Sequence, residues 1–134
     1  MMNRIACVIL NYNDAPQVET LVQHIRGYQA IHDIVVVDNF SSDDSFSVLE
    51  RLRSDKIHVC RTDRNGGYGY GNNFGVRYAR EHCGSDTILI ANPDVFFSEE
   101  LVCRLQSALY FKPDTGVSSA IQRDRDDREV DCSA

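Results

Sequence analysis

Polar side chains that can hold a ligand occur in four separate clusters along the chain. These clusters are Asn11-Tyr12-Asn13, Asp38, the segment from Asn65 to Asn73, and Asn92-Pro93-Asp94. Asparagine amides, a tyrosine hydroxyl and carboxylates can hydrogen-bond a polar small molecule together only if the fold brings them to one place. The elements around each cluster therefore decide what chemistry is available.

Each cluster follows an apolar run that has the pattern of a strand. The four runs span residues 5–10, 34–37, 57–60 and 87–91, and a last short run spans residues 116–121. Helical spacing of apolar residues is found in segments that run from Asp14 to Ile25, from Ser41 to Leu52, from Phe74 to Glu81 and from Ser98 to Leu109. This alternation predicts an α/β fold of three layers, with helices on both faces of a mostly parallel sheet. Ligands of such sheets bind beyond the carboxyl ends of the strands, where all four clusters would lie.

Several charged residues near these clusters also have a purely structural interpretation. Asp14 precedes a helical segment with Pro16 in its first turn, which favours helix capping over ligand contact. Asp38 can be held by the backbone of the following Ser-Ser turn or can contact a ligand, and the residues favour neither interpretation. Asp94 can simply start a turn after its proline, and Arg61 is expected as a solvated surface charge. Only convergence on one edge of the sheet favours a binding site.

The segment NGGYGYGNNFG, from Asn65 to Gly75, contains five of the eight glycines in the chain. Its spacing fits neither the dinucleotide fingerprint GxGxxG nor a phosphate loop in which Gly-Lys precedes Ser or Thr. Interleaved aromatic residues and the helical pattern that follows disfavour a disordered linker. We predict a tight turn that lets the backbone approach a ligand closely, with Asn72 and Asn73 offering amides to that ligand.

Composition disfavours several classes of protein. The 134 residues carry a net charge of −6 with a pI ≈ 5.1, whereas binding to nucleic acid or to an anionic membrane needs clustered basic residues. The apolar run at residues 5–10 is too short to cross a bilayer and no secretory leader precedes it, so a cytoplasmic protein is expected. The cysteines form no CxxC pair and the histidines no HxxxH pair, so spacing indicates neither a zinc site nor a disulfide scaffold. Cys7 and Cys103 are expected to be buried thiols.

Four motifs together resemble the donor-binding half of the family 2 glycosyltransferases, which have the GT-A fold. They are VILNYND at residues 8–14, VVVDNFSSDDS at 35–45, NGGYGYGNNFG at 65–75 and LIANPDV at 89–95. Each motif is short, but their order and spacing are specific, and the similarity is greatest to the bacterial branch that includes rhamnosyltransferases. The resemblance implies inverting transfer of a hexose or deoxyhexose from a dTDP-, UDP- or GDP-linked donor to a hydroxyl of a glycan or lipid-linked acceptor.

The resemblance also implies which residues hold the nucleotide. Positions that line the base, ribose and diphosphate in the family are occupied here by Asn11, Tyr12, Asn13, Asp38, Asn65, Gly67, Asn72, Asn73, Asn92 and Asp94. Asp38 would hydrogen-bond the base, the residues around Tyr12 would lie beside base and ribose, and the glycine segment would form the floor of the pocket.

The resemblance further implies a divalent cation, Mg²⁺ or Mn²⁺, shared between protein and diphosphate. Asn92-Pro93-Asp94 occupies the place of the family's Asp-x-Asp motif, with Asn92 in place of the first carboxylate. Asp94 is therefore the one carboxylate implied to hold the metal. A hard cation with oxygen ligands would neutralise the charge that gathers on a leaving diphosphate.

The similarity covers residues from about 5 to 110, so the chain is expected to be a truncated transferase. We assign residues 1–121 to a donor-binding half-domain and residues 122–134 to a charged tail that is expected to fray. The family's catalytic base belongs to a following half, so no residue here is given that role and the chain alone is expected to be inactive. Peripheral association with the inner face of the membrane is expected through the acceptor.

Two alternatives stay open. A nucleotidyltransferase has a similar sheet but would carry a basic, glycine-rich segment directly after the first strand, where this chain has Asn-Tyr-Asn-Asp. The other alternative is a non-catalytic nucleotide-binding or interaction module on a degenerate transferase scaffold. An incomplete domain of this kind would expose apolar surface and self-associate.

Overall fold

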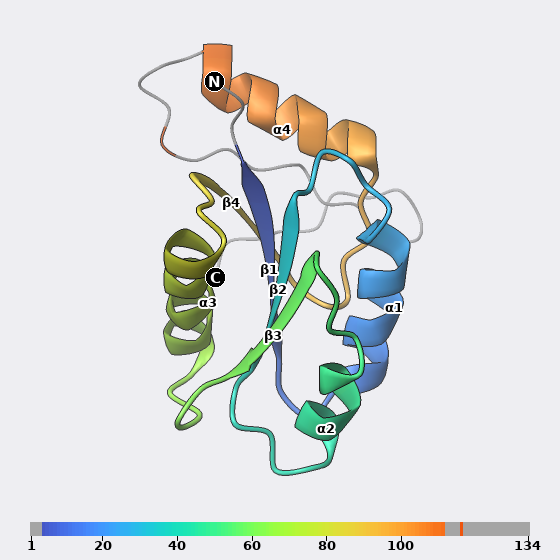
Figure 1. Cartoon of the computed structure of the whole chain (residues 1–134), viewed down its shortest axis with the longest axis vertical. Helices are drawn as coiled ribbons and strands as arrows, with labels where there is room; N and C mark the ends of the chain where they lie inside the picture. The colour runs from blue at the N-terminus through green and yellow to red at the C-terminus, as the bar shows by residue number, and fades with distance from the viewer. Residues whose placement is uncertain (1–3, 112–115, 117–134) are drawn as a thin grey trace, which may run out of the picture. The chain divides into compact units, whose positions relative to one another are not determined.

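The computed structural model describes residues 4–111 and Gly116, and the chain divides into two compact units, residues 1–96 and residues 97–134. The second unit contains α4 (Glu99–Phe111). The first unit alternates strands and helices, which are β1 (Ile5–Asn11), α1 (Ala15–Ile25), β2 (Asp33–Asp38), α2 (Ser45–Glu50), β3 (Ile57–Arg61), α3 (Tyr68–His82) and β4 (Thr87–Ala91). This order confirms the predicted α/β fold (Figure 1).

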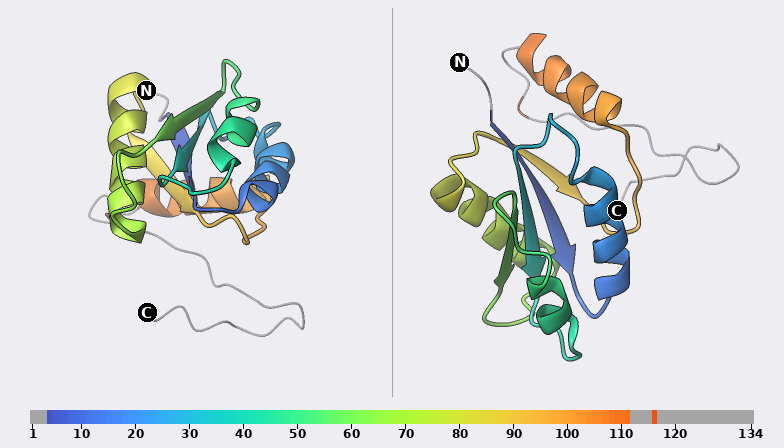
Figure 2. Two further views of the ribbon diagram at one scale, coloured as in Figure 1. Left: turned by 90° about the horizontal axis from the view of Figure 1, so that it is seen from below. Right: turned by 45° about the vertical axis from the view of Figure 1, so that its right-hand side comes forward.

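The four described strands form one parallel sheet in the order β3-β2-β1-β4. The chain moves outward from β1 through β2 to β3 and then crosses to β4 on the other side of β1. Helices α1 and α2 cover one face of the sheet and α3 covers the other, as right-handed crossovers require when the direction of winding reverses (Figures 1 and 2). The predicted three layers are therefore confirmed, and the winding reverses between β1 and β4.

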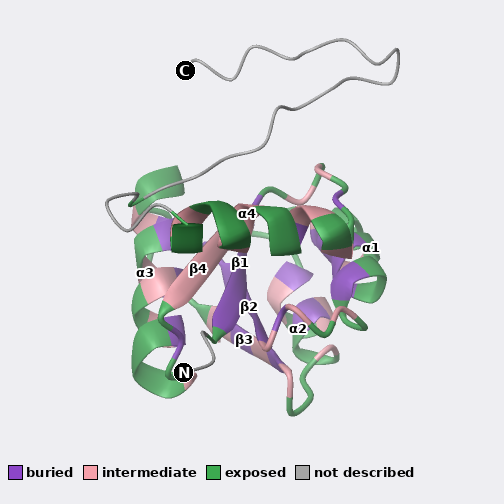
Figure 3. Ribbon diagram, turned by 90° about the horizontal axis from the view of Figure 1, so that it is seen from above, coloured by how far each residue is buried: buried purple, intermediate pink, exposed green. Residues whose placement is uncertain are grey.

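Strands β1 and β2 form the buried centre of the sheet (Figure 3). Apolar side chains from Ile5 to Ile9 and from Ile34 to Val37 are at most 2% exposed. Layers of helix on both faces explain why these runs are continuously apolar rather than alternating. β4 lies at an edge of the sheet that the described residues form, and its Ile90 is 48% exposed.

Helix α3 begins at Tyr68, so the predicted start at Phe74 is wrong by almost two turns. Most of the glycine segment is helical, and the tight turn is confined to the residues before Tyr68. Gly67 caps the helix with a φ of 96°, a conformation that side chains rarely adopt. Packing against the sheet overrides the weak helix propensity of glycine and asparagine here.

Two glycines of α3 face the sheet rather than a ligand. A methyl group on Gly75 would lie 2.5 Å from Val8 Cγ1 and 2.8 Å from Val37 Cγ2. A methyl group on Gly71 would collide with the side chain of Leu10. These glycines therefore let the helix backbone come close to β1 and β2.

Two helices, α1 and α4, begin where the sequence predicts, but only α4 has the predicted side-chain cap. Asp14 is the N-cap residue of α1 with Pro16 in the first turn, yet its carboxylate makes no capping hydrogen bond. Instead, its backbone N–H donates to Asn11 Oδ1 at 3.1 Å. In α4 the predicted cap is present, since the Leu101 N–H donates to Ser98 Oγ at 3.2 Å.

The two cysteines predicted to be buried differ from each other. Cys7 is buried in β1, and burial raises the pKa of its thiol to about 12. Cys103 is exposed, because the buried side chain of α4 at this point is that of its neighbour Val102. The prediction for Cys103 is therefore wrong.

Among residues 4–111, no helix is both long enough and apolar enough to cross a membrane. The predicted strand at 116–121, the tail at 122–134 and the boundary between them lie outside the described residues, apart from Gly116. Those assignments stay predictions.

Candidate functional site

A pocket of about 290 Å³ opens at the carboxyl ends of the strands, where α3 begins. Its lining comes from β1, from the loops that follow all four strands and from the first residue of α3, and consists of Leu10, Tyr12, Asn39, Asn65, Gly67, Tyr68, Asn92 and Pro93. The ends of β1 and β4, between which the winding reverses, both border it. Open α/β sheets bind their ligands at such a switch point. The four sequence clusters thus converge on one edge of the sheet, as the parallel topology predicts.

Side-chain amides join the loops that form the pocket wall. Asn39 Nδ2 donates to Asn65 Oδ1 and to the Gly67 carbonyl, both at 3.1 Å, and the Gly67 N–H donates to Asn65 Oδ1 at 3.0 Å. The Tyr68 hydroxyl donates to Asn92 Oδ1 at 2.9 Å. The start of α3 is thereby tied to the loops that follow β2 and β4.

Asp38, the last residue of β2, is completely buried. Its Oδ1 accepts hydrogen bonds from Asn11 Nδ2 at 3.0 Å and from Ser41 Oγ at 2.5 Å. Its Oδ2 accepts from the Ser41 N–H at 3.1 Å and lies 3.5 Å from Arg61 Nε. The carboxylate therefore holds together the loops after β1 and β2 and the end of β3. Because this carboxylate is completely buried, a ligand could contact it only if the residues around it moved.

The loop after β1 is locked to the loop after β2 on both sides of Tyr12. Asn11 forms the inner contact with Asp38, as described above. Asn13, with a φ of 54°, accepts the Ser42 N–H on its Oδ1 at 2.9 Å and donates from Nδ2 to Ser42 Oγ at 3.0 Å. Asparagine tolerates this left-handed conformation better than most residues. The two asparagines fix the backbone, and Tyr12 between them is left 48% exposed at the pocket.

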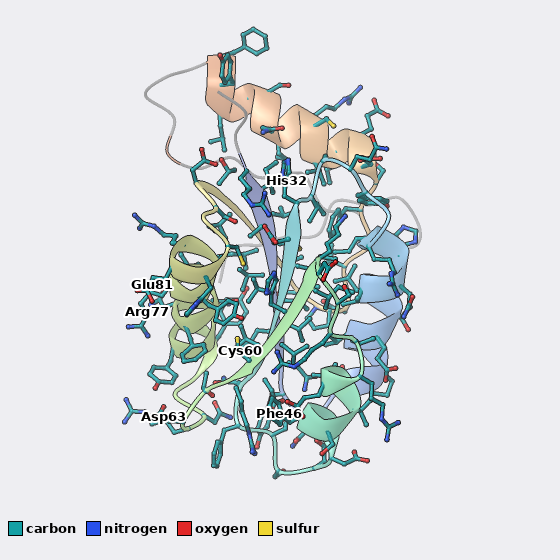
Figure 4. All side chains as sticks on the ribbon, in the orientation of Figure 1. His32, Phe46, Cys60, Asp63, Arg77 and Glu81 are labelled. Carbon is teal, nitrogen blue, oxygen red and sulfur yellow. The ribbon has the colours of Figure 1, made fainter. Side chains whose placement is uncertain are left out.

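Arg61 organises the loop after β2 rather than pointing freely into solvent. Its guanidinium lies 4.5 Å from the ring centroid of Phe40 and 5.3 Å from that of Phe46, and it donates to the Ser41 carbonyl at 3.3 Å. Phe46 projects at the carboxyl edge of the sheet (Figure 4). Phe40 has a φ of 60°, which is rare for a bulky residue. Cation–π contacts and the hydrogen bond stabilise that conformation, so Arg61 is exposed, as expected, but is also engaged by this loop.

The paired asparagines of α3 occupy different environments. Asn72 is 5% exposed, and neither polar atom of its amide has a hydrogen-bond partner among the described residues. Asn73 is exposed on the helix. Buried amides without a partner are rare in folded proteins, so that of Asn72 calls for an explanation.

The structure divides the ten predicted nucleotide-binding residues into three groups. Those that line the pocket are Tyr12, Asn65, Gly67 and Asn92. Those that are buried are Asn11, Asp38 and Asn72. Those that are exposed and outside the pocket lining are Asn13, Asn73 and Asp94.

Two polar pocket residues, Asn39 and Tyr68, are missing from the predicted set. Asn39 directly follows Asp38, and Tyr68 lies inside the glycine segment. Asn39 could be found from the rule that residues just after a strand face the ligand. Tyr68 is missing because the sequence pattern places the start of α3 at Phe74, whereas the helix begins at Tyr68.

Comparison with known sequences gives two matches that cover most of the chain. The sequence model of the family described as Glycosyl transferase family 2 matches residues 6–131. The low-salt glycan biosynthesis hexosyltransferase Agl10 of Haloferax volcanii is 31% identical over 100 residues, which make up 75% of this chain and 31% of that protein.

Two solved structures share the fold at low sequence identity. Mannosyltransferase PcManGT from Pyrobaculum calidifontis, in complex with GDP-Man and Mn²⁺, matches with a TM-score of 0.78 at 21% identity, over 92% of this chain and 36% of that one. S. aureus TarS 1-349, in complex with UDP, matches with a TM-score of 0.63 at 16% identity, over 88% and 39% of the two chains. The chain thus spans between 31% and 39% of the length of these three proteins.

Proposed function

Because the chain belongs to the family 2 glycosyltransferases, we propose that its pocket holds the nucleotide of a nucleotide diphosphate sugar, for transfer of the sugar to an acceptor hydroxyl. The observation that carries this proposal is the convergence of the loops after all four strands on one pocket of about 290 Å³. Ligand pockets begin at about 300 Å³, so this volume suits a base and ribose with the sugar lying outside.

The donor's base and ribose are assigned to the part of the pocket near Tyr12. Its exposed ring offers a face for a base, and the Asn65 amide offers a hydrogen bond, whereas the buried Asn39 amide is engaged by the pocket wall. In this proposal the donor is not contacted by Asn11, Asn13 and Asp38. These residues fix the loops that hold Tyr12 at the pocket.

The diphosphate is assigned to the start of α3. Gly67 caps this 15-residue helix without a side-chain hydrogen bond, and no acidic residue occupies its first turn. Backbone N–H groups at such a helix start attract anions, as does the helix dipole. An acidic protein can therefore hold an anionic donor locally.

The sugar and the stereochemistry are proposals that rest on the motifs and on one neighbour. The GDP-Man bound to the Pyrobaculum mannosyltransferase makes a GDP-linked hexose the first donor to test, before UDP- and dTDP-linked sugars. The similarity of the motifs to rhamnosyltransferases makes a deoxyhexose the second choice. Inversion at the anomeric carbon is proposed on the same motifs.

Asp94 is the carboxylate proposed to hold Mg²⁺ or Mn²⁺ beside the diphosphate. It is exposed in the turn that follows β4, and the preceding Pro93 lines the pocket. A carboxylate oxygen is a suitable ligand for either cation, and bound phosphates would complete the coordination. The cation would neutralise charge on the diphosphate.

We expect titration of the protein with GDP, UDP and dTDP in Mn²⁺ to give measurable heat for at least one nucleotide. Asp94→Ala should weaken the metal-dependent part of binding by at least about tenfold, since it removes the protein's ligand to the cation. Glu81→Ala is the matched control, because Glu81 is an exposed acid on α3 (Figure 4). No heat with any nucleotide would refute donor binding, whereas unchanged metal dependence in Asp94→Ala would refute only the metal assignment.

Asn72→Leu should stabilise the protein but weaken its binding of nucleotide. A buried amide without partners costs about 1–3 kcal/mol, so leucine of similar size should raise the free energy of unfolding by about 1 kcal/mol while it weakens nucleotide binding about tenfold. Asn73→Leu, at the exposed neighbour, should change the free energy of unfolding by less than about 0.5 kcal/mol. Denaturant unfolding and calorimetry measure the two effects. Unweakened nucleotide binding by Asn72→Leu would exclude Asn72 from the site.

Transfer by this chain alone is proposed to be absent or slow. None of the described residues that line the pocket is a carboxylate, so this part of the lining offers no general base for an acceptor hydroxyl. A transfer assay with the 134-residue protein and simple acceptors measures this. The cytoplasmic setting, peripheral membrane association and self-association also stay proposals, which cell fractionation and sedimentation velocity test.

A further inference from the structure

Three metal-ligating side chains gather at the amino edge of the sheet, away from the pocket. Asp33 is the first residue of β2, His58 lies near the start of β3, and Cys83 follows the last turn of α3. One ligand atom from each lies within 4.8 Å of the other two. Asp33 and Asp38 begin and end the same strand, so this cluster is about 16 Å from the hydrogen bonds around Asp38 on the pocket side.

The cluster has dimensions close to those of a tetrahedral zinc site. Zn–N and Zn–O bonds of about 2.0–2.1 Å place neighbouring ligand atoms about 3.4 Å apart. Asp33 Oδ1 and His58 Nε2 are hydrogen-bonded at 3.2 Å, which is close to that separation, so a metal would take the place of the proton between them. The Cys83 sulfur lies within 4.8 Å of the other two ligand atoms, so it would need to move by at most about 1 Å to form a Zn–S bond of about 2.3 Å. Cys83 is partly exposed, so a small adjustment of its side chain is feasible.

Arg4 holds Asp33 in place through one carboxylate oxygen, and the other oxygen faces His58. Arg4 Nε donates to Asp33 Oδ2 at 2.9 Å, and the Asp33 side chain is only 4% exposed. Carboxylates that ligate metals are commonly hydrogen-bonded on their other oxygen, which fixes their orientation. A thiolate and a carboxylate together balance the charge of a divalent ion, so Arg4 can keep its ion pair with Asp33.

We propose that Asp33, His58 and Cys83 bind a thiophilic divalent cation, Zn²⁺ in the first place, with water as the fourth ligand. The ion would join β2, β3 and the end of α3 at the edge opposite the pocket. Thiolate and imidazole select zinc over Mg²⁺ and Mn²⁺, which prefer oxygen ligands. The site is therefore independent of the cation proposed for the diphosphate.

Cobalt titration of the chelator-treated protein tests this site, because Co²⁺ reports thiolate ligation through a charge-transfer absorption band. We expect one equivalent of Co²⁺ to produce the band and Zn²⁺ to displace it. Cys83→Ser should abolish the band, and both Cys83→Ser and His58→Gln should weaken Zn²⁺ binding by at least about tenfold. Circular dichroism checks that the variants are folded.

Two controls distinguish the cluster from other ligands in the chain. Cys103→Ser removes an exposed thiol on α4 and should leave the band and the Zn²⁺ affinity unchanged. Asp94→Ala should also leave both unchanged, since it alters the pocket side of the sheet. The proposal is overturned if the parent protein gives no thiolate band, if Cys83→Ser retains it, or if Cys103→Ser loses it.

Discussion

Gly75→Ala is expected to destabilise the protein by about 1–3 kcal/mol, although alanine is the better helix former. The added methyl group would lie 2.5 Å from Val8 and 2.8 Å from Val37, and both valines are fully buried in the central strands. Close-packed interiors do not yield by such distances without moving whole elements. The clash should therefore exceed the gain of about 1 kcal/mol from helix propensity.

Gly69→Ala is the matched control for this substitution. It lies in the same helix, and its methyl group would meet no atom within 4 Å. We expect this variant to gain up to about 1 kcal/mol. Urea unfolding of both variants measures the difference, and equal stability would show that α3 does not rest on Gly75.

Asp38→Ala is expected to cost about 1–3 kcal/mol, the range for leaving buried hydrogen-bond donors without an acceptor. The substitution leaves the Ser41 N–H without its acceptor and Arg61 without its carboxylate, and it leaves Asn11 Nδ2 with Ser41 Oγ alone. Because these groups join three loops, nucleotide binding should be lost together with stability.

Asp94→Ala provides the contrast, since an exposed aspartate outside such a network should change the free energy of unfolding by less than about 0.5 kcal/mol. Thermal and denaturant unfolding of the two variants measure the effect. A loss below about 1 kcal/mol in Asp38→Ala would mean that the network contributes little to the fold.

The sheet and the edge that carries the pocket could be predicted from sequence because both depend on local patterns. Buried parallel strands produce unbroken apolar runs such as that from Ile5 to Leu10, which are recognisable without tertiary information. Parallel pairing then places every residue that follows a strand at one edge. Tyr12, Asn65 and Asn92 reach the pocket for this reason.

The start of α3 could not be predicted in this way. A stretch that begins Tyr68-Gly69-Tyr70-Gly71 has weak helix propensity, and only its packing against β1 and β2 makes it helical. The error carried over to Asn72 and Asn73, which were treated as equivalent loop amides. In a helix, neighbouring residues point in different directions, so one is buried and the other exposed.

The spacing of residues in the sequence could not predict the cluster of Asp33, His58 and Cys83 either. Asp33 and His58 are 25 residues apart and come from different strands, so no short motif records their proximity. Their contact follows from the pairing of β2 with β3, which aligns Val35 with His58 and so places the beginnings of the two strands side by side.

Gly71 and Gly75, the two glycines of α3 that face the sheet, also determine which substitutions the pocket can tolerate. Where two elements meet through interlocking side chains, a change at one position can be absorbed by its neighbours. At Gly71 and Gly75 the helix backbone lies directly against Leu10, Val8 and Val37, so an added side chain must displace the helix as a unit. Gly67 and Tyr68 would move with it. The shape of this pocket therefore depends on residues that no ligand would touch.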